Sequence, residues 1–231
     1  MCTAFVHKGD DLIVGFDFDL DPAMFTYGVY KRKDKFFIGI TVGSTTYRTH
    51  GVNRNGNAGN LPYMNGSTDW PRRRGEAYRR LDVLNDRYIA GKSTYAELLQ
   101  DVRTKTVVNL PGMSMHSQFT DADGHILIVE PGVGYREVDA PYSIVTNYPV
   151  LDVPADLSSP FYGADRYQTG LSRLQGATDA FSVDDGLRLL EAVKQGGQWA
   201  TRVSFLYSQN DNAVYYTLDG DFSRVFEHRF A

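Results

Sequence analysis

The chain has 231 residues, of which 42% are hydrophobic and 13% aromatic, with a formal net charge of −4 and a pI near 5.7. This length and hydrophobic content predict one sizeable core, and we expect a single domain that spans residues 1–231. The acidic balance argues against nucleic acid or an anionic membrane surface as the main partner.

The number of cysteines and the first residues of the chain bear on which sites the protein can hold and on where in the cell it is expected. One cysteine cannot form an internal disulfide, and no CxxC or CxxH pair is present to hold zinc. No apolar stretch reaches the length of a membrane span, and the first residues lack the basic and apolar regions of a signal peptide. These features predict a cytoplasmic protein without a membrane anchor.

The single cysteine is Cys2. Removal of Met1 would leave one residue with both a thiol and a free α-amino group, whose pKa of about 7.7–8.0 suits a base for a thiol of pKa about 8.5. The alternative is an unimportant cysteine at a frayed terminus. The following residues favour the first interpretation, because residues 3–7 and 12–16 have strand composition and residues 8–11 form a hairpin turn. Such a hairpin returns Asp19 to Cys2.

Met1-Cys2-Thr3, a hairpin and then Gly15-x-x-x-Asp19 resemble the start of the choloylglycine hydrolase and penicillin V acylase family. The resemblance implies an N-terminal nucleophile hydrolase that cuts linear carbon–nitrogen amide bonds, with a four-layered αββα fold. The family's aspartate falls on Asp19. Its usual arginine after the glycine is replaced by Phe16, which leaves open a degenerate binding protein that retains the fold.

Strands are next predicted over residues 25–30 and 36–42, and residues 47–63 read as a strand, a tight turn and a second extended segment. This last stretch resembles the family's Gly-x-Asn-x-x-Gly-x-Ala block. A gapless count from the block places the family's oxyanion-hole or substrate-contacting side chain on Tyr63, whereas one short deletion would place it on Asn60. An aromatic side chain packed under a loop is the alternative for Tyr63.

Residues 76–103 are predicted to be helical, with a capping box at Thr94, and strands return over residues 115–120 and 126–130. His116 begins a stretch that resembles another family block, so it is the histidine to consider as an alternative base.

Thr146-Asn147-Tyr148-Pro149 follows a strand-like run, at the position in chain order where the family has Thr-Asn-x-Pro. The resemblance implies that Asn147 donates to an oxyanion, and an amide at a sheet rim can do so. The alternative is an asparagine that satisfies the backbone of a turn.

A second helical region is predicted from about residue 159 to residue 194, with a capped start at Ser182, and strands over residues 199–207 and 213–218 close the chain. Arg166 resembles the family's arginine near the cysteine sulfur. The order strands, helices, strands, helices, strands predicts an α+β fold with two sheets between two helical layers.

Together these residues predict an amide hydrolase in which Cys2 attacks an acyl carbonyl and its own α-amino group carries the proton. Asp19 is expected to steady that amine, and Asn147 with Tyr63 or a backbone N–H to hold the oxyanion. The resemblance implies that Arg166 lies near the sulfur. The expected substrate is an N-acylated small molecule, and the mechanism requires no metal or organic cofactor. An acyltransferase of the same fold is the alternative activity, and the sequence leaves the oligomeric state open, a homo-oligomer included.

Overall fold

The computed structural model describes residues 2–64, 75–151 and 163–231. Its described strands form two large antiparallel sheets and one small parallel pair. The first large sheet has the order β12-β1-β2-β13-β14-β15. Its strands are β1 (Cys2–Lys8), β2 (Leu12–Asp19), β12 (Tyr142–Val145), β13 (Thr201–Ser208), β14 (Ala213–Leu218) and β15 (Phe226–Arg229).

The second large sheet has the order β11-β10-β9-β6-β5-β4-β3 among the described residues. Its strands are β3 (Thr26–Arg32), β4 (Lys35–Val42), β5 (Thr45–Asn53), β6 (Ala58–Gly59), β9 (Ser117–Thr120), β10 (Ile126–Glu130) and β11 (Gly134–Glu137). The small parallel pair joins β7 (Tyr78–Arg80) to β8 (Thr106–Val108).

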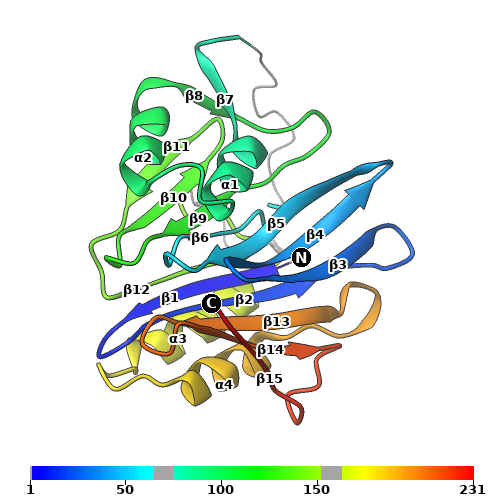
Figure 1. Ribbon diagram of the computed structural model, residues 1–231, viewed down its shortest axis with the longest axis vertical. Coiled ribbons are helices and arrows are strands. Elements are labelled where there is room, and N and C mark those ends of the chain that lie inside the picture. Colours follow the sequence, from blue (N-terminus) through cyan, green and yellow to red (C-terminus); the bar gives the residue numbers. More distant parts are fainter. Residues whose placement is uncertain (1, 65–74, 152–162) are drawn as a thin grey trace.

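Two helix pairs cover the outer faces of the sheets (Figure 1). Helices α1 (Leu81–Ile89) and α2 (Tyr95–Thr104) lie over the second sheet, and α3 (Ala164–Gln175) and α4 (Val183–Val193) lie over the first. The order of layers is therefore helix, sheet, sheet, helix, as the sequence predicted.

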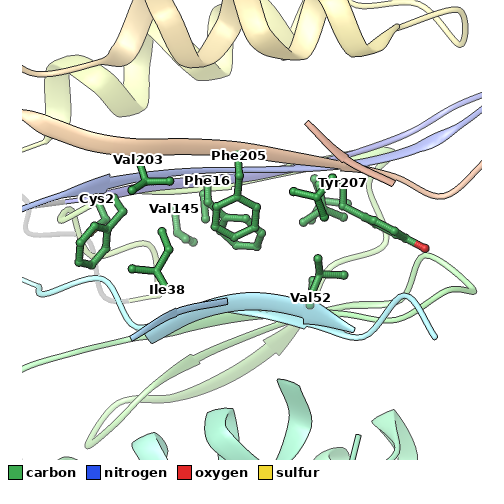
Figure 2. Packing of buried hydrophobic residues seen from close by; sticks show 14 of the residues in the cluster. Cys2, Phe16, Ile38, Val52, Val145, Val203, Phe205 and Tyr207 are labelled. Carbon is green, nitrogen blue, oxygen red and sulfur yellow. The ribbon is translucent and has the colours of Figure 1, made fainter. Parts of the chain in front are cut away.

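The largest hydrophobic cluster fills the space between the two sheets (Figure 2). Phe16 and Phe205 come from the first sheet, and Ile38 and Val52 come from the second. Side chains alternate along a strand, so the residues between them face the helices instead. This explains why the central strands are apolar on both faces, since each face is covered by another layer.

Local signals explain several of these elements. Strands β1 and β2 form an antiparallel hairpin. Lys8 lies opposite Leu12 next to the turn, and Cys2 lies opposite Phe18 at the open end. Thr94 caps α2 through a reciprocal pair of hydrogen bonds with Glu97, and Ser182 caps α4 in the same way with Asp185.

Three expectations about element limits were wrong. Residues 78–80, expected to be helical, form strand β7 because they pair with β8. Trp199, expected to start a strand, belongs to the 3₁₀ turn Gly197–Trp199. Strands β11 and β15 were not predicted; β11 is exposed along its whole length, and β15 is a short edge strand in which half-buried and exposed residues alternate. The start of the second helical region, residues 159–162, lies outside the described residues.

None of the described helices is long and apolar enough to cross a membrane.

Candidate active site

The site is built around the first residue of β1. Cys2 lies at the end of the hairpin opposite Phe18, and its side chain joins the buried cluster between the sheets. Asp19 ends β2 on the neighbouring strand, and it faces the helical side. The hairpin thus brings both residues to one rim of the sheet, and both are buried there.

Asn147 reaches Cys2 because β12 pairs with the other edge of β1. Val145 lies opposite Ala4, so the two residues that follow β12 come alongside the start of β1. The Cys2 backbone nitrogen donates to Asn147 Oδ1 at 2.8 Å. Asn147 Nδ2 donates to the backbone carbonyl of Tyr63. The side-chain amide therefore joins β1 to the segment that precedes β7.

Arg166 enters from α3 and binds the same group of atoms. Its guanidinium donates to Asn147 Oδ1 at 2.7 Å, to the Cys2 carbonyl at 2.9 Å and to Thr3 Oγ1 at 3.1 Å. It also lies 3.5 Å from Asp19 Oδ2. Asn147 Oδ1 thus accepts from two donors, the Cys2 nitrogen and Arg166, and this fixes which end of the amide faces Cys2.

Asp19 is held by residues from the far end of the chain. Thr201 Oγ1 donates to Asp19 Oδ1, and Gln195 Nε2 donates to Asp19 Oδ2, each at 2.6 Å. Together with Arg166, these donors satisfy a carboxylate that has almost no contact with solvent.

Burial dominates the ionisation of the site. Burial raises the pKa of the Cys2 thiol, and the negative charge of Asp19 raises it further. The positive amino terminus, the Asp19 backbone N–H and Arg166 lower the thiol pKa, but they do not offset this rise. The pKa of Asp19 is also raised by burial, against the amino terminus, Arg166 and its two side-chain donors. A buried thiol of this kind needs a base beside it before it can act as a nucleophile.

A second buried carboxyl lies beside this site. Asp17 is directly opposite Thr3 and Ser204 in the sheet and two residues before Asp19 on the same face. Burial raises the pKa of Asp17 well above its ordinary value, and the charge of Asp19 raises it further. The Ser204 hydroxyl and the charges of Arg166 and Lys194 only partly oppose this rise. Of the two carboxyl groups, Asp19 is therefore the one that holds a negative charge more readily, because it has the donors.

The two candidates for the oxyanion position differ in the structure. Tyr63 contributes its backbone carbonyl to Asn147, while its side chain is 45% exposed. Asn60 is fully buried, and its amide donates to the Gln118 carbonyl and accepts from the Gln118 backbone N–H, each at 3.1 Å. Both ends of the Asn60 amide thus bind the β9 backbone, and of the two residues it is Tyr63 that contacts Asn147, through its backbone carbonyl.

His116 does not face Cys2. One ring nitrogen lies 3.2 Å from Glu130 Oε1 and the other lies 2.6 Å from the Thr146 carbonyl oxygen. Both nitrogens are therefore occupied, and His116 has none with which to take the thiol proton. Phe16, at the position of the family arginine, packs against Phe205 with ring centroids 4.6 Å apart and supplies no charge to the site.

Several residues of this group were not singled out in the sequence. Thr3 and Thr201 bind Arg166 and Asp19, Gln195 completes the Asp19 shell, and Asp17 lies next to it. Thr3 belongs to the Met1-Cys2-Thr3 motif, and Asp17 carried a signal of its own, since an acidic residue within an otherwise apolar strand is costly to bury. Thr201 and Gln195 are 182 and 176 residues from Asp19 in the chain, so no local pattern links them.

A metal site is not part of this arrangement. Within the described ranges, the one close group of three metal-binding side chains is Asp121, Asp123 and His125. It lies in the hairpin turn between β9 and β10, where His125 already donates to the Asp121 carboxylate. The carboxyl, amide and guanidinium groups at Cys2 bind one another, which suits acid–base and nucleophilic chemistry.

No protein-family model matches the sequence, and no curated protein sequence matches it. Solved structures do match. A mutant of the conjugated bile acid hydrolase from Clostridium perfringens aligns with a TM-score of 0.73 at 11% identity, over 99% of this chain and 92% of the other. Penicillin V acylase from Agrobacterium tumefaciens aligns with a TM-score of 0.64 at 14% identity, over 98% and 85% of the two chains.

A third match is the Caenorhabditis elegans ortholog of N-acylethanolamine-hydrolyzing acid amidase, with a TM-score of 0.58 at 14% identity, over 90% of this chain and 93% of the other. At these identities the likeness concerns the fold alone. The chain has the αββα fold of the N-terminal nucleophile hydrolases over nearly its whole length.

Proposed function

We propose that the protein hydrolyses the linear amide bond of an N-acylated small molecule, with Cys2 as an N-terminal nucleophile after removal of Met1. The observation that carries this proposal is the 2.8 Å hydrogen bond from the Cys2 nitrogen to Asn147 Oδ1, together with the Arg166 contacts that fix Asn147. This arrangement supplies an acceptor at the position where a free α-amino group would form.

The α-amino group is the proposed base. With Met1 removed, the Cys2 nitrogen changes from an amide that cannot accept a proton to an amine of ordinary pKa about 7.7–8.0. Asn147 Oδ1 accepts one of its protons and Asp19 stabilises the ammonium that forms when the thiol proton arrives. The raised pKa of the buried thiol makes this transfer necessary.

The chemical steps follow from these positions. The Cys2 thiolate attacks the acyl carbonyl carbon, and the carbonyl oxygen becomes an oxyanion. Asn147 Nδ2 has two N–H donors and only one is directed at the Tyr63 carbonyl, so the second serves the oxyanion. The ammonium then protonates the leaving amine, and a water molecule activated by the same amine hydrolyses the thioester to release the acid.

The substrate class rests on the fold and on this chemistry. The matched hydrolases are named for conjugated bile acids, penicillin V and N-acylethanolamines. We propose substrates of the same general kind for this chain, an acyl group joined to a small amine through one linear amide.

The N-terminus provides the test. Two samples of the same chain, one processed and one with Met1 retained by inhibition of methionine aminopeptidase, are verified by intact mass. Both are then assayed on phenoxyacetyl, bile-acid and long-chain acyl amides. We expect hydrolysis by the processed sample alone, and its loss in a processed Cys2→Ala variant that retains the native circular dichroism spectrum. Equal activity with Met1 retained would exclude the α-amino base, and equal activity without the thiol would exclude Cys2 as the nucleophile.

A further inference from the structure

A buried histidine and a buried glutamate lie directly behind Asn147. His116 precedes β9 and Glu130 ends β10, and neither side chain has any solvent exposure. The His116 Nδ1 atom lies 3.2 Å from Glu130 Oε1, and Nε2 lies 2.6 Å from the carbonyl oxygen of Thr146. That carbonyl belongs to the peptide bond whose nitrogen is that of Asn147.

The partners of the ring determine where its protons are. A backbone carbonyl only accepts hydrogen bonds, so Nε2 must carry a proton. Glu130 accepts from the backbone N–H groups of Val150 at 2.8 Å and Leu151 at 3.1 Å, as a carboxylate does. Burial acts to raise the pKa of Glu130, but the hydrogen bond and charge of His116 and the two backbone donors bring it below its ordinary value. Both oxygens of Glu130 accept backbone N–H groups, so the carboxylate faces Nδ1 as an acceptor and Nδ1 carries a proton as well.

We propose that His116 and Glu130 form a buried imidazolium–carboxylate pair that fixes the Thr146–Asn147 peptide and so positions the Asn147 side chain at Cys2. His116 holds this segment on the amino-terminal side of Asn147, and Glu130 holds it on the carboxyl-terminal side through Val150 and Leu151. Both are positioning residues, because neither touches Cys2.

The rest of the segment fits this assignment. Thr146 Oγ1 donates to the Gly163 carbonyl at 2.8 Å, so the side chain of Thr146 is held from α3 while its carbonyl is held by His116. Within this segment, the side chain of Asn147 binds the Cys2 nitrogen. A small rotation of the 146–147 peptide would move Oδ1 away from that nitrogen, and an error of about 1 Å in such a group can cost about 10²-fold in rate.

The first test measures the protons directly. The chain is labelled with ¹⁵N in its histidine rings. The ring signals of His116 are assigned as those that are missing from the spectrum of the His116→Gln variant. At pH 7 we expect two protonated ring nitrogens for His116. The Glu130→Gln variant keeps the shape of the side chain and can donate to Nδ1, so there we expect one protonated and one unprotonated nitrogen. One unprotonated nitrogen in the native chain would overturn the ion pair.

The second test measures the positioning. The side-chain amide of Asn147 gives its own ¹H–¹⁵N signals, assigned from their loss in Asn147→Asp. We expect Glu130→Gln to shift these signals, whereas the matched control Glu137→Gln, an exposed residue of β11 paired with Arg103, leaves them unchanged. Unchanged Asn147 signals in Glu130→Gln would overturn the positioning role. This readout needs no activity, so it stands whether or not the proposed function holds.

The catalytic consequence rests on the proposed function. On a substrate that the processed enzyme hydrolyses, we expect Glu130→Gln to lower kcat by roughly 10²-fold with KM nearly unchanged, and Glu137→Gln to alter neither. A fall confined to KM, or no fall at all in a variant whose Asn147 signals have moved, would show that this position of Asn147 is not the one that catalysis requires.

Discussion

At the level of single residues, the Asn147 amide makes the central contacts of the site. It accepts from the Cys2 nitrogen and Arg166, and it donates to the Tyr63 carbonyl. On the proposed mechanism, Asn147→Ala removes a side-chain donor that acts on the oxyanion, which forms only during the reaction. We expect kcat to fall by roughly 10²–10³-fold with little change in KM, as measured by steady-state hydrolysis.

Asn60→Ala is the matched control for this prediction. Asn60 is equally buried, but its amide is bound at both ends to the Gln118 backbone. We expect a lower melting temperature and an unchanged kcat. The opposite pattern, a large loss of kcat in Asn60→Ala and none in Asn147→Ala, would exchange the roles of the two residues.

Asp17 allows a prediction about stability and pH. In the folded chain its pKa is raised well above the ordinary value of 3.8, chiefly by burial. Above about pH 4 the unfolded chain loses this proton while the folded chain keeps it, so the wild-type free energy of unfolding falls as pH rises, by at most roughly 1.4 kcal/mol per pH unit. Asp17→Asn removes this dependence. We therefore expect the variant to be more stable than the wild type, by a margin that grows as the pH rises above about 4.

Thermal unfolding across that pH range measures the margin. Asp123→Asn, which neutralises an exposed carboxyl in the β9–β10 turn, is the control and is expected to follow the wild type at every pH. A margin that stays constant or shrinks as the pH rises would mean that the pKa of Asp17 is not raised in the folded chain.

At the level of elements, the β1–β2 hairpin depends on a glycine. Gly15 lies opposite Phe5, and a Cβ atom added to Gly15 would lie only 2.2 Å from the Phe5 ring. That ring is fully buried and packs edge-on against Phe181, so it has little room to move. Because Gly15 has no side chain, the Phe5 ring can lie across β2 at this position.

Gly15→Ala should accordingly destabilise the fold by about 1–3 kcal/mol, as overpacking of a core does, measured by urea unfolding. In Gly196→Ala the added methyl group has no neighbour within 4 Å, so it should change stability by less than about 0.5 kcal/mol. Similar small effects in both variants would show that the core around Phe5 can rearrange.

At the level of the whole molecule, the two halves, each a sheet with its helix pair, are held together by the apolar contact between the two sheets. Phe36 of β4 lies against Phe205 of β13 with ring centroids 5.1 Å apart, and both rings are fully buried. These residues come from opposite sheets and are distant in sequence, so their contact forms only when the sheets stack. Figure 2 shows Phe205 at the centre of this interface.

Phe36→Ala leaves a cavity in this interface and should lower the free energy of unfolding by about 3–5 kcal/mol. Tyr135→Ala truncates a ring that is 40% exposed on β11 and should cost much less. Urea unfolding followed by far-ultraviolet circular dichroism measures both. A small loss in Phe36→Ala would mean that the sheets are held together elsewhere.

The sequence by itself determined the features that depend on near neighbours in the chain. The hairpin after Cys2, the capping boxes at Thr94 and Ser182 and the helix–sheet order are set by turn residues, reciprocal hydrogen bonds and apolar periodicity over a few residues. The hairpin alone sufficed to predict that Asp19 returns beside Cys2. The resemblance added Asn147 and Arg166, and the structure places both of them there.

Only the tertiary structure decided which groups surround these residues. Docking of α3 brings Arg166 to Cys2, and pairing of β13 with β2 brings Thr201 to Asp19 across most of the chain. The binding of Asn60 to the Gln118 backbone and of His116 to Glu130 depended on which way each side chain faces once β9 is in place. Local sequence cannot specify such contacts, because they form between elements whose positions are fixed by burying apolar faces against one another.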